Sequence, residues 1–465
     1  MAPWGLLAWA TFSCSWAISL DEIDYSPEDI ITRDVAIVGG GASGTYAAVR
    51  LQQDLRKSVV VVERKNVLGG HTETYHDPVT GSIIDIGVLA FHDLPIVHDF
   101  FDRFDIPLDK LTFNLAGLER VDFRTGNPVT VFIDPNETQL ALSRWAAHLA
   151  RFPTLNDGFV FPFPVPDDLL LSFREFVAKY NLAAIVSSIW SVAQGYGDIL
   201  SLPTLYVLKI FGPHILHSLS TGFFSTRRQN NHQVYEKALQ SLGEDTNVFL
   251  NSVIVSMARD LPGSFARAVV RTPSGYKLLR AKQFLFTLPP KLDHLSGFDL
   301  DGEEINLFSQ FSSIDYYTGL LRDCPVPPNI SLSNMVADPS TFYLPRLPTC
   351  YTLGLIQSSS NLTNVKFSSN ITTMGVGEVR AQITAEARTV VAGSRPSLAV
   401  LSNHGPFGLQ VSANAIRHGF YQKLNRLQGR RRSFWTGAAW HVHDSALLWN
   451  FTEGILTHMQ LSDCP

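Results

Sequence analysis

The clearest pattern of hydrophobic positions lies in residues 34–63. One continuous apolar run covers residues 35–38, a second covers residues 59–62, and a helical pattern over 45–55 separates them. Short apolar runs rich in β-branched residues are typical of strands in a parallel sheet that is covered on both faces. The pattern therefore predicts a strand–helix–strand unit with parallel strands.

A second β-rich region spans residues 247–288. Its apolar runs alternate with turn signals at Pro262-Gly263 and at residues 273–275, which predicts a small meander closed by a return strand. The runs cover residues 248–250, 252–257, 266–272 and 283–288.

The remaining blocks are mixed in character. Residues 93–245 combine an aromatic and proline-rich segment at 152–166 with predicted helices at 170–180 and 182–192. Residues 305–425 are similarly mixed, and the pattern turns apolar again towards the C-terminus. The alternation of blocks predicts two parts that are interleaved along the chain.

The composition is that of a globular enzyme with a large interior. The chain has 465 residues, of which 45% are hydrophobic and 17% charged, and its formal net charge is -5. A chain without a basic field does not attract phosphate backbones, so no nucleic acid partner is expected.

The N-terminal residues have the pattern of a targeting segment. The apolar run ends at Ala17, Ser19 follows it, and no Lys or Arg precedes it. The run has the length of a signal-peptide core and is too short for a stable membrane span, so we predict a cleaved signal over residues 1–19; a buried N-terminal helix is the alternative. A secreted or endomembrane-lumen protein is expected, with glycosylation at the acceptor triplets that begin at Asn136, Asn329, Asn361 and Asn370; Asn450 begins a fifth triplet.

Cysteine usage leaves two alternatives open. Without Cys14, which the signal would remove, the chain retains Cys324, Cys350 and Cys464. Cys324 and Cys350 could form one disulfide or remain buried thiols. No cysteine spacing resembles a zinc or iron–sulfur site.

A glycine-rich turn follows the first predicted strand. Gly39, Gly41 and Gly44 occupy the GxGxxG positions, with Ala42 and Ser43 between them, and Glu63 ends the next strand. Such a turn lets the backbone approach a pyrophosphate at a helix N-terminus, and the acid accepts from ribose hydroxyls. The motif predicts a dinucleotide site; Glu63 disfavours NADP, which leaves FAD and NAD.

The residues after Glu63 resemble the flavin-containing amine oxidase superfamily. The similarity lies in residues 68–72 (LGGHT), 81–87 (GSIIDIG), 251–259, 287–290 (TLPP) and 434–437 (FWTG). It implies bound FAD, with Arg64, Gly70, Val253, Gly437 and Ala438 at the cofactor beside the glycine turn. His71 replaces the usual Arg, and no acid follows Gly437. These departures look most like the fungal β-cyclopiazonate dehydrogenase (oxidocyclase) family, which implies a role in secondary metabolism.

The resemblance also implies the fold class. We expect an α/β protein with a Rossmann-type FAD-binding domain, similar to those of amine oxidases and glutathione reductase, interleaved with an α+β substrate domain. The FAD-binding domain would comprise residues 33–92, 246–304 and 426–465, and the substrate domain residues 93–245 and 305–425.

Several side chains could act at the flavin. His71 is either a covalent flavin anchor or a hydrogen-bonded histidine that supports the cofactor, and His92 either reaches the flavin face or is an ordinary surface histidine. His441, His443 and Asp444 do not share a helical face, so positions near the flavin ring are favoured over a metal site. Trp435 and Trp440 are interpreted as one core residue and one cavity wall. His92, His441 and Trp435 are the catalytic candidates.

No second GxGxxG motif provides an NADPH site. Gly375 and Gly377 lack the third glycine. We therefore predict an oxidase or dehydrogenase that takes a hydride from carbon next to nitrogen, or a similarly activated carbon, of a small molecule, with oxidative cyclisation as a further step. The electrons would leave to molecular oxygen or another acceptor. The alternatives are a prenylcysteine-oxidase-like thioether oxidase and a non-catalytic flavin-binding protein.

Overall fold

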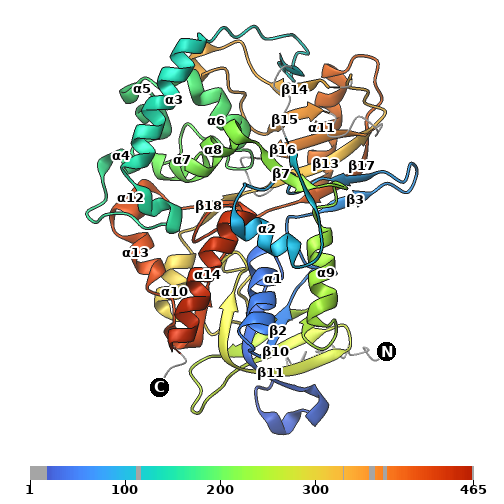
Figure 1. Ribbon diagram of the computed structural model, residues 1–465, viewed down its shortest axis with the longest axis vertical. Coiled ribbons are helices and arrows are strands. Elements are labelled where there is room, and N and C mark those ends of the chain that lie inside the picture. The colour runs from blue at the N-terminus through green and yellow to red at the C-terminus, as the bar shows by residue number, and fades with distance from the viewer. Residues whose placement is uncertain (1–17, 112–116, 328, 355–361, 370–373, 463–465) are drawn as a thin grey trace, which may run out of the picture.

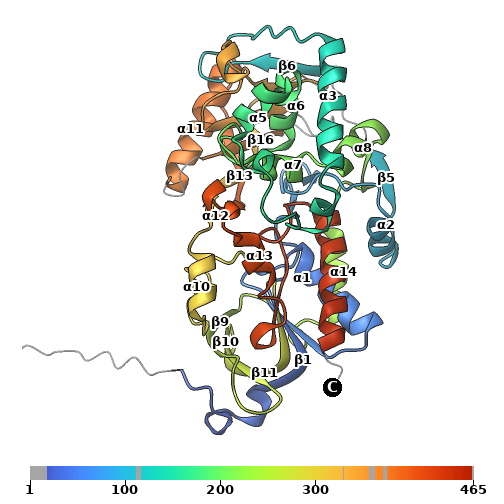
Figure 2. The same cartoon turned by 90° about the vertical axis from the view of Figure 1, so that its left-hand side faces the viewer.

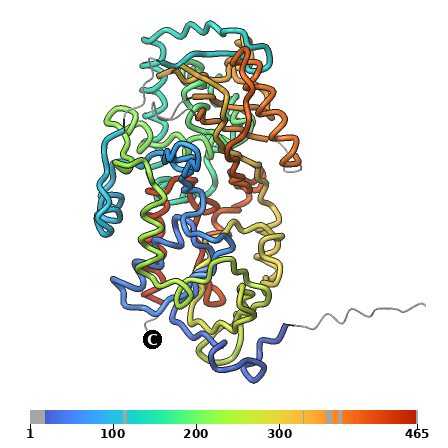
Figure 3. The backbone as a smooth tube through the Cα atoms, turned by 90° about the vertical axis from the view of Figure 1, so that its right-hand side faces the viewer, coloured from blue at the N-terminus to red at the C-terminus, as the bar shows by residue number. Residues whose placement is uncertain are grey.

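Two sheet-containing bodies lie one above the other along the long axis of the molecule (Figures 1 and 2). The computed structural model describes residues 18–111, 117–327, 329–354, 362–369 and 374–462. Figure 3 shows that the lower body combines N-terminal (blue), middle (yellow-green) and C-terminal (red) segments. The chain therefore passes between the bodies more than once.

The lower body is built on a seven-stranded sheet in the order β8-β2-β1-β11-β10-β9, with β19 also paired to β11. Strands β8, β2, β1, β11 and β19 are parallel, while β9, β10 and β11 form an antiparallel meander. The bounds are β1 Ile30–Val38, β2 Val59–Val62, β8 Val248–Phe249, β9 Val253–Ala258, β10 Ala266–Thr272, β11 Gly275–Phe286 and β19 Ser433–Trp435. The parallel unit and the meander confirm the predicted Rossmann-type fold class. The expected return strand is the second half of β11.

Alternate residues of β1 enter different cores, as expected for a sheet that is covered on both faces. Val35 and Ile37 pack with the helices on one face, whereas Ala36 and Val38 join the large core on the other. The helices on the first face are α1 Ala42–Val49, α2 Pro95–Asp102, α9 Gln233–Leu242 and α14 Ser445–Ser462. The predicted helix over 45–55 is observed as α1 followed by a π-helical stretch, η3 (Arg50–Asp54). Helices α2 and α9 thus belong to the Rossmann core, although they lie in the block assigned to the substrate domain.

The upper body contains a six-stranded sheet in the order β17-β13-β16-β15-β14-β6. Helix α11 (Val376–Val390) packs on one face, where Val365 and Phe367 of β16 meet Ile383. The strands are β6 Leu118–Val121, β13 Tyr316–Arg322, β14 Ser331–Asn334, β15 Thr349–Gly354, β16 Thr363–Ser368 and β17 Ser397–Asn403. All neighbouring pairs are antiparallel except β6 and β14.

A group of helices completes the upper body beside this sheet (Figure 1). They are α3 Pro135–Ala150, α4 Asp167–Leu170, α5 Phe173–Tyr180, α6 Val186–Val192, α7 Thr204–Ile210 and α8 Pro213–Thr221. The helix predicted over 170–180 is interrupted, because Ser172 caps α5 in a reciprocal pair with Glu175. Three smaller strand pairs are the hairpin of β3 Thr74–His76 with β4 Ile83–Asp85, the pair of β5 Leu108–Leu111 with β7 Phe223–Thr226, and the pair of β12 Ser312–Ile314 with β18 Phe407–Gln410. The remaining helices are α10 Gly302–Phe308, α12 Ala413–Arg417 and α13 Phe420–Asn425.

The structure also places the predicted processing sites. Asn136 and Asn329 are exposed, whereas Asn361, Asn370, Cys464 and residues 1–17 of the expected signal lie outside the described residues. Cys324 and Cys350 are buried free thiols, so the second of the two alternatives for this pair is observed. Within the described ranges, no helix has both the length and the apolar character needed to cross a membrane.

Candidate active site

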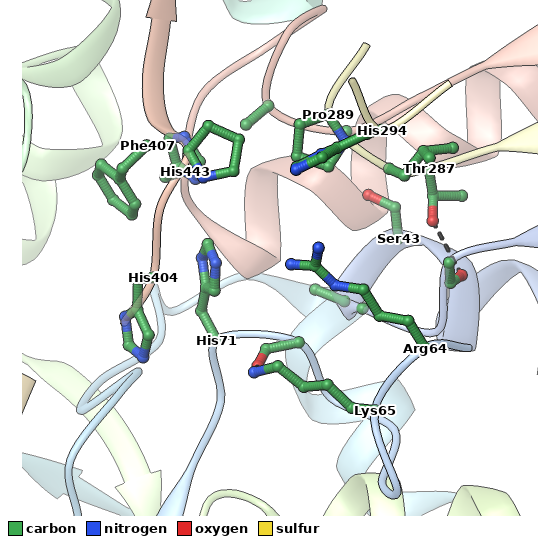
Figure 4. A pocket seen from close by; sticks show the side chains of 18 of the residues that line it. Ser43, Arg64, Lys65, His71, Thr287, Pro289, His294, His404, Phe407 and His443 are labelled. Atoms are coloured by element: carbon green, nitrogen blue, oxygen red, sulfur yellow. Dashed lines mark hydrogen bonds between the residues drawn. The ribbon is translucent and has the colours of Figure 1, made fainter. Parts of the chain in front are cut away.

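A cavity of about 870 Å³ lies where the carboxyl ends of β1 and β2 face the upper body. We call it the first cavity. The loops beyond the carboxyl ends of parallel strands are the usual ligand site of open α/β sheets. Figure 4 shows Ser43, Arg64 and Lys65 at one side and the rings of His71, His404, Phe407 and His443 at the other.

The glycine turn leaves the backbone open toward this cavity. Gly39 has φ +105°, and a Cβ at Gly44 would lie 1.9 Å from the Gly39 carbonyl oxygen, so these two glycines are required by the turn itself. Gly41 differs, because a Cβ there would meet only the Cα of Gly70, at 3.8 Å. The space between Gly41 and Gly70 is therefore a cradle that a branched side chain would fill.

Glu63 is fixed at the rim of this cradle. Its carboxylate accepts from the backbone N–H groups of Gly40 at 2.6 Å and Lys65 at 2.7 Å. The Oγ of Ser43 is buried at the cavity wall and has no partner among the described residues. An orphaned hydroxyl beside an open glycine backbone at the N-terminus of α1 fits a pyrophosphate, and the acid fits a ribose hydroxyl. The residues present thus fit a dinucleotide.

The remaining residues that the sequence placed at the cofactor also line the first cavity. Val253 begins β9, and Gly437 and Ala438 follow β19. The full set comprises Gly39, Gly41, Ala42, Ser43, Glu63, Arg64, Gly70, His71, Val253, Gly437 and Ala438. Gly44 lies behind the turn, where it is buried.

Four rings form one wall of the cavity. His71 stacks on His404 with ring centroids 4.5 Å apart, and Phe407 stacks on His443 at 3.8 Å. Burial lowers the pKa of His71, and it lowers the pKa of His443 to about 3. The Nε2 atom of His443 accepts from the backbone N–H of Gly408 at 3.1 Å. Burial therefore favours the neutral form of His71 and His443 in this wall. His404 and Phe407 escaped sequence reasoning because they belong to no motif.

A second cavity of about 1120 Å³ meets the first. The residues that line both cavities, which we call the cavity junction, include Ser191, Gln194, Lys366, Phe407, His443 and Asp444. Of the Asp, Glu, Lys and Arg side chains that the structure describes, Lys366 and Asp444 alone lie at this junction. The two cavities therefore adjoin at these residues.

His92 supports Asp444 at the junction. It is 2% exposed and lines the second cavity, so it is neither a surface histidine nor part of the first cavity. Its Nε2 lies 3.1 Å from Oδ2 of Asp444, and its Nδ1 lies 2.8 Å from Oγ of Ser218. Burial disfavours the charged form of both groups, but the attraction between them outweighs it. The pKa of Asp444 is therefore lowered and the pKa of His92 is raised. The contact therefore favours the charged forms of both the Asp444 carboxyl and the His92 ring.

Of the predicted cluster, His443 and Asp444 lie at the cavity junction, whereas His441 lines only the second cavity. His441 turns to Lys209, whose Nζ lies 3.4 Å from its Nε2 and donates to the carbonyl of Leu155 at 2.5 Å. Burial lowers the pKa of Lys209 to about 7 and that of His441 to about 3. Among the described residues, no group of three or more His, Cys, Asp or Glu side chains could hold a metal ion.

Trp435 and Trp440 both lie in the core, rather than one in the core and one at a cavity. They are 0% and 1% exposed and stack on each other with ring centroids 5.5 Å apart. Trp435 also packs on Phe286 of β11, because β19 pairs with that strand. Neither indole lines the two cavities, so Trp435 has no direct contact with a ligand there.

Comparison with known proteins identifies the class of cofactor. Residues 37–104 match the model of an NAD(P)-binding Rossmann-like domain. An FAD-dependent oxidoreductase of Cochliobolus heterostrophus (strain C5) is 35% identical over 96% of this chain and 95% of its own length. The β-cyclopiazonate dehydrogenase of Aspergillus oryzae is 33% identical over 93% of this chain and 94% of its own length. The chain belongs to this family of FAD-dependent oxidoreductases.

Solved structures show the same fold. A CLA-producing fatty acid isomerase from P. acnes superposes with a TM-score of 0.76 at 20% identity, covering 95% of this chain and 99% of that one. Putrescine oxidase superposes with a TM-score of 0.64 at 17% identity, covering 93% and 100%. The FAD-dependent oxidoreductase thus has an amine-oxidase-like fold, as the resemblance implied. Its glycine turn, Ser43, Glu63 and the backbone at Val253 and Gly437 would hold FAD, which when bound supplies a hydride acceptor.

Proposed function

We propose that this oxidoreductase removes a hydride from a carbon next to nitrogen, or from a similarly activated carbon, of a small molecule held at the cavity junction. The observation that supports this reaction is the Asp444 carboxylate, which the His92 contact at 3.1 Å keeps ionised where the two cavities meet. An anionic oxygen at that point can bind a substrate N–H group and accept its proton.

The side chains around Asp444 serve this proton transfer. As the carbon loses its hydride, the N–H proton passes to the carboxylate and a C=N bond forms. His92 holds the Asp444 carboxylate in position at 3.1 Å, and Ser218 contacts the other ring nitrogen of His92 at 2.8 Å. Across the first cavity, the stacked rings of His71, His404, Phe407 and His443 form a flat wall on which a ring of the substrate can pack.

Oxidative cyclisation is the second part of the proposal. A C=N carbon is electrophilic, and a nucleophilic carbon of the same molecule can attack it if water is excluded. The second cavity has about 1120 Å³, which is large enough to hold a folded multi-ring substrate beside the junction. The relative from Aspergillus oryzae is named a dehydrogenase, which supports the dehydrogenation that precedes this step.

Anaerobic mixing tests the reaction. Purified FAD-loaded protein is mixed with an indole alkaloid amine, and bleaching of the flavin absorbance is followed before air is admitted and hydrogen peroxide is measured. We expect bleaching with the amine and none with its N-acyl amide. Bleaching with farnesylated cysteine instead would favour the thioether oxidase, which needs no N–H and should be insensitive to Asp444→Asn.

We also propose that the protein is secreted or lumenal. The apolar leader and the exposed acceptor sites Asn136 and Asn329 support this location. Expression in a fungal host followed by glycosidase treatment tests it. A mobility shift and a mature N-terminus near residue 20 are expected; intracellular protein that retains Met1 and carries no glycan would contradict it.

Covalent attachment of the flavin through His71 is the remaining proposal about the cofactor. His71 lines the first cavity beside Gly70, and its neutral imidazole is the form that can act as a nucleophile. Acid precipitation followed by mass spectrometry decides the matter. Flavin that stays entirely in the supernatant excludes a tether at any residue.

A further inference from the structure

Lys366 occupies an unusual position in the upper sheet. It lies in β16, which pairs with β13 on one side and β15 on the other, and its register partners are Thr318 and Thr352. Its strand is therefore held rigidly by neighbours on both edges. The Lys366 side chain is only partly exposed, and removing an ammonium group from water is costly.

The two faces of β16 have different environments. Val365 and Phe367 point into the core beneath α11, whereas Asn364 and Lys366 line the second cavity. Thr352 of the neighbouring strand β15 lines the same cavity. This side of the sheet is thus a polar floor, and Lys366 is the residue of that floor that also reaches the first cavity.

No described side chain neutralises Lys366. Neither a hydrogen bond nor an ion pair joins its ammonium group to the described residues, and burial alone lowers its pKa, to about 8. The carboxylates that line the second cavity have other partners: Asp444 contacts His92, and Asp85 accepts from the backbone N–H of Asn231 at 2.9 Å. The junction therefore carries a positive charge that lacks a counter-ion from the described chain.

We propose that Lys366 is a specificity-determining residue that binds a negatively charged oxygen group of the substrate at the cavity junction. Asp444 binds the N–H group of the substrate and Lys366 binds its anionic oxygen. Together the two residues select molecules that carry both groups. This inference rests on the proposed function for the location of the reacting carbon, but the binding of the anion itself needs no turnover.

Ligands with one tail and two head groups test the proposal. The visible spectrum of the FAD-loaded protein is titrated with decanoate and with decan-1-ol. We expect decanoate to bind most tightly, and Lys366→Met to weaken decanoate by about 10- to 100-fold, the effect of one lost charge-assisted hydrogen bond, with decan-1-ol unchanged. Lys366→Arg should retain most of the affinity.

Lys110→Met is the matched control. Lys110 also lines the second cavity but is exposed and lies outside the junction, so decanoate binding should not change. Flavin content and the rate at which photoreduced flavin is reoxidised by air are measured for every variant. Equal losses for decanoate and decan-1-ol, or unchanged decanoate affinity with slower reoxidation, would overturn the proposal. Asp444→Asn distinguishes the two proposals. If it loses amine oxidation but binds decanoate as the wild type does, anion binding by Lys366 is independent of the proposed reaction at Asp444.

Discussion

At the scale of single residues, the glycines of the turn after β1 have two different roles. Gly44 is required by the protein, since a Cβ would lie 1.9 Å from the Gly39 oxygen, whereas Gly41 has free space up to Gly70. Sequence spacing identifies both but cannot separate these roles, because the distinction depends on Gly70, which approaches from another loop.

This distinction predicts the behaviour of Gly41→Val. The folded protein has room for a Cβ, but the two methyl groups would occupy the cradle, so the variant should fold and retain almost no FAD. The ratio of flavin absorbance to protein absorbance measures the loss. Gly377→Val, at an open position of α11, is the control and should stay yellow. A yellow, folded Gly41→Val protein would disprove the placement of the cofactor.

Asp444→Asn tests the junction carboxylate. The amide cannot accept the substrate proton, so kcat/KM should fall by about 100-fold or more, with FAD content unchanged. The pH profile is a second readout. Because His92 lowers the pKa of Asp444, the wild-type activity should persist below the ordinary titration range of an Asp and decline only at lower pH. The variant should lack this acid limb. A normal rate in Asp444→Asn would remove Asp444 from the reaction.

At the scale of elements, local patterns predicted structure well where the partners are close in sequence. The strands β1 and β2 and the meander follow from short apolar runs and turn residues. The helix over 170–180 was placed less well, because the capping pair of Ser172 and Glu175 starts a new helix inside an apolar run. Lys366 and His404 could not be found, because their roles depend on strand register and on a loop from the other body.

The hairpin β3–β4 provides a pH-dependent element. Asp85 ends β4 and accepts from Oγ1 of Thr74 and from the backbone N–H of Asn231, and burial raises its pKa to about 7. A raised folded-state pKa stabilises the protein below the unfolded value of 3.8, and this contribution is lost as the pH rises to about 7. Asp85→Asn keeps the acceptor but cannot titrate.

Urea unfolding from pH 4 to 8 checks this expectation. The free energy of unfolding of the wild type, relative to Asp85→Asn, should fall across that interval by on the order of 4 kcal/mol. Asp34→Asn is the control, because the pKa of Asp34 is shifted in the opposite direction. Its ion pair with Lys282 and its hydrogen bonds with Lys282 and Ser58 lower that pKa to about 2, so the contribution of Asp34 to the free energy of unfolding is lost only in more acidic solution. Parallel curves for wild type and Asp85→Asn would contradict the prediction.

At the scale of the whole molecule, the interleaved chain places the cofactor cavity between the two bodies. Gly41 and Glu63 line it from the Rossmann sheet, and Tyr316, Lys366 and His404 line it from the upper body. The discontinuous organisation was predictable, because the family resemblance sets the order of the segments. The packing of α2 and α9 against the lower sheet was not, since their amphipathic patterns do not reveal which body they cover.

A ligand held by both bodies should stabilise them together. We expect both sheets to unfold in a single thermal transition, and FAD to raise its midpoint temperature. Binding to the folded state adds about 2.7 kcal/mol to the free energy of unfolding at a free FAD concentration 100 times Kd. Scanning calorimetry of the protein stripped of flavin measures the shift, and Gly41→Val should abolish it while the unliganded transition stays near that of the wild type. If FAD moved one of two separate transitions and left the other in place, the cofactor would be held by the Rossmann body alone. The rings of His404 and Phe407 would then be a wall for the substrate and no part of the cofactor site.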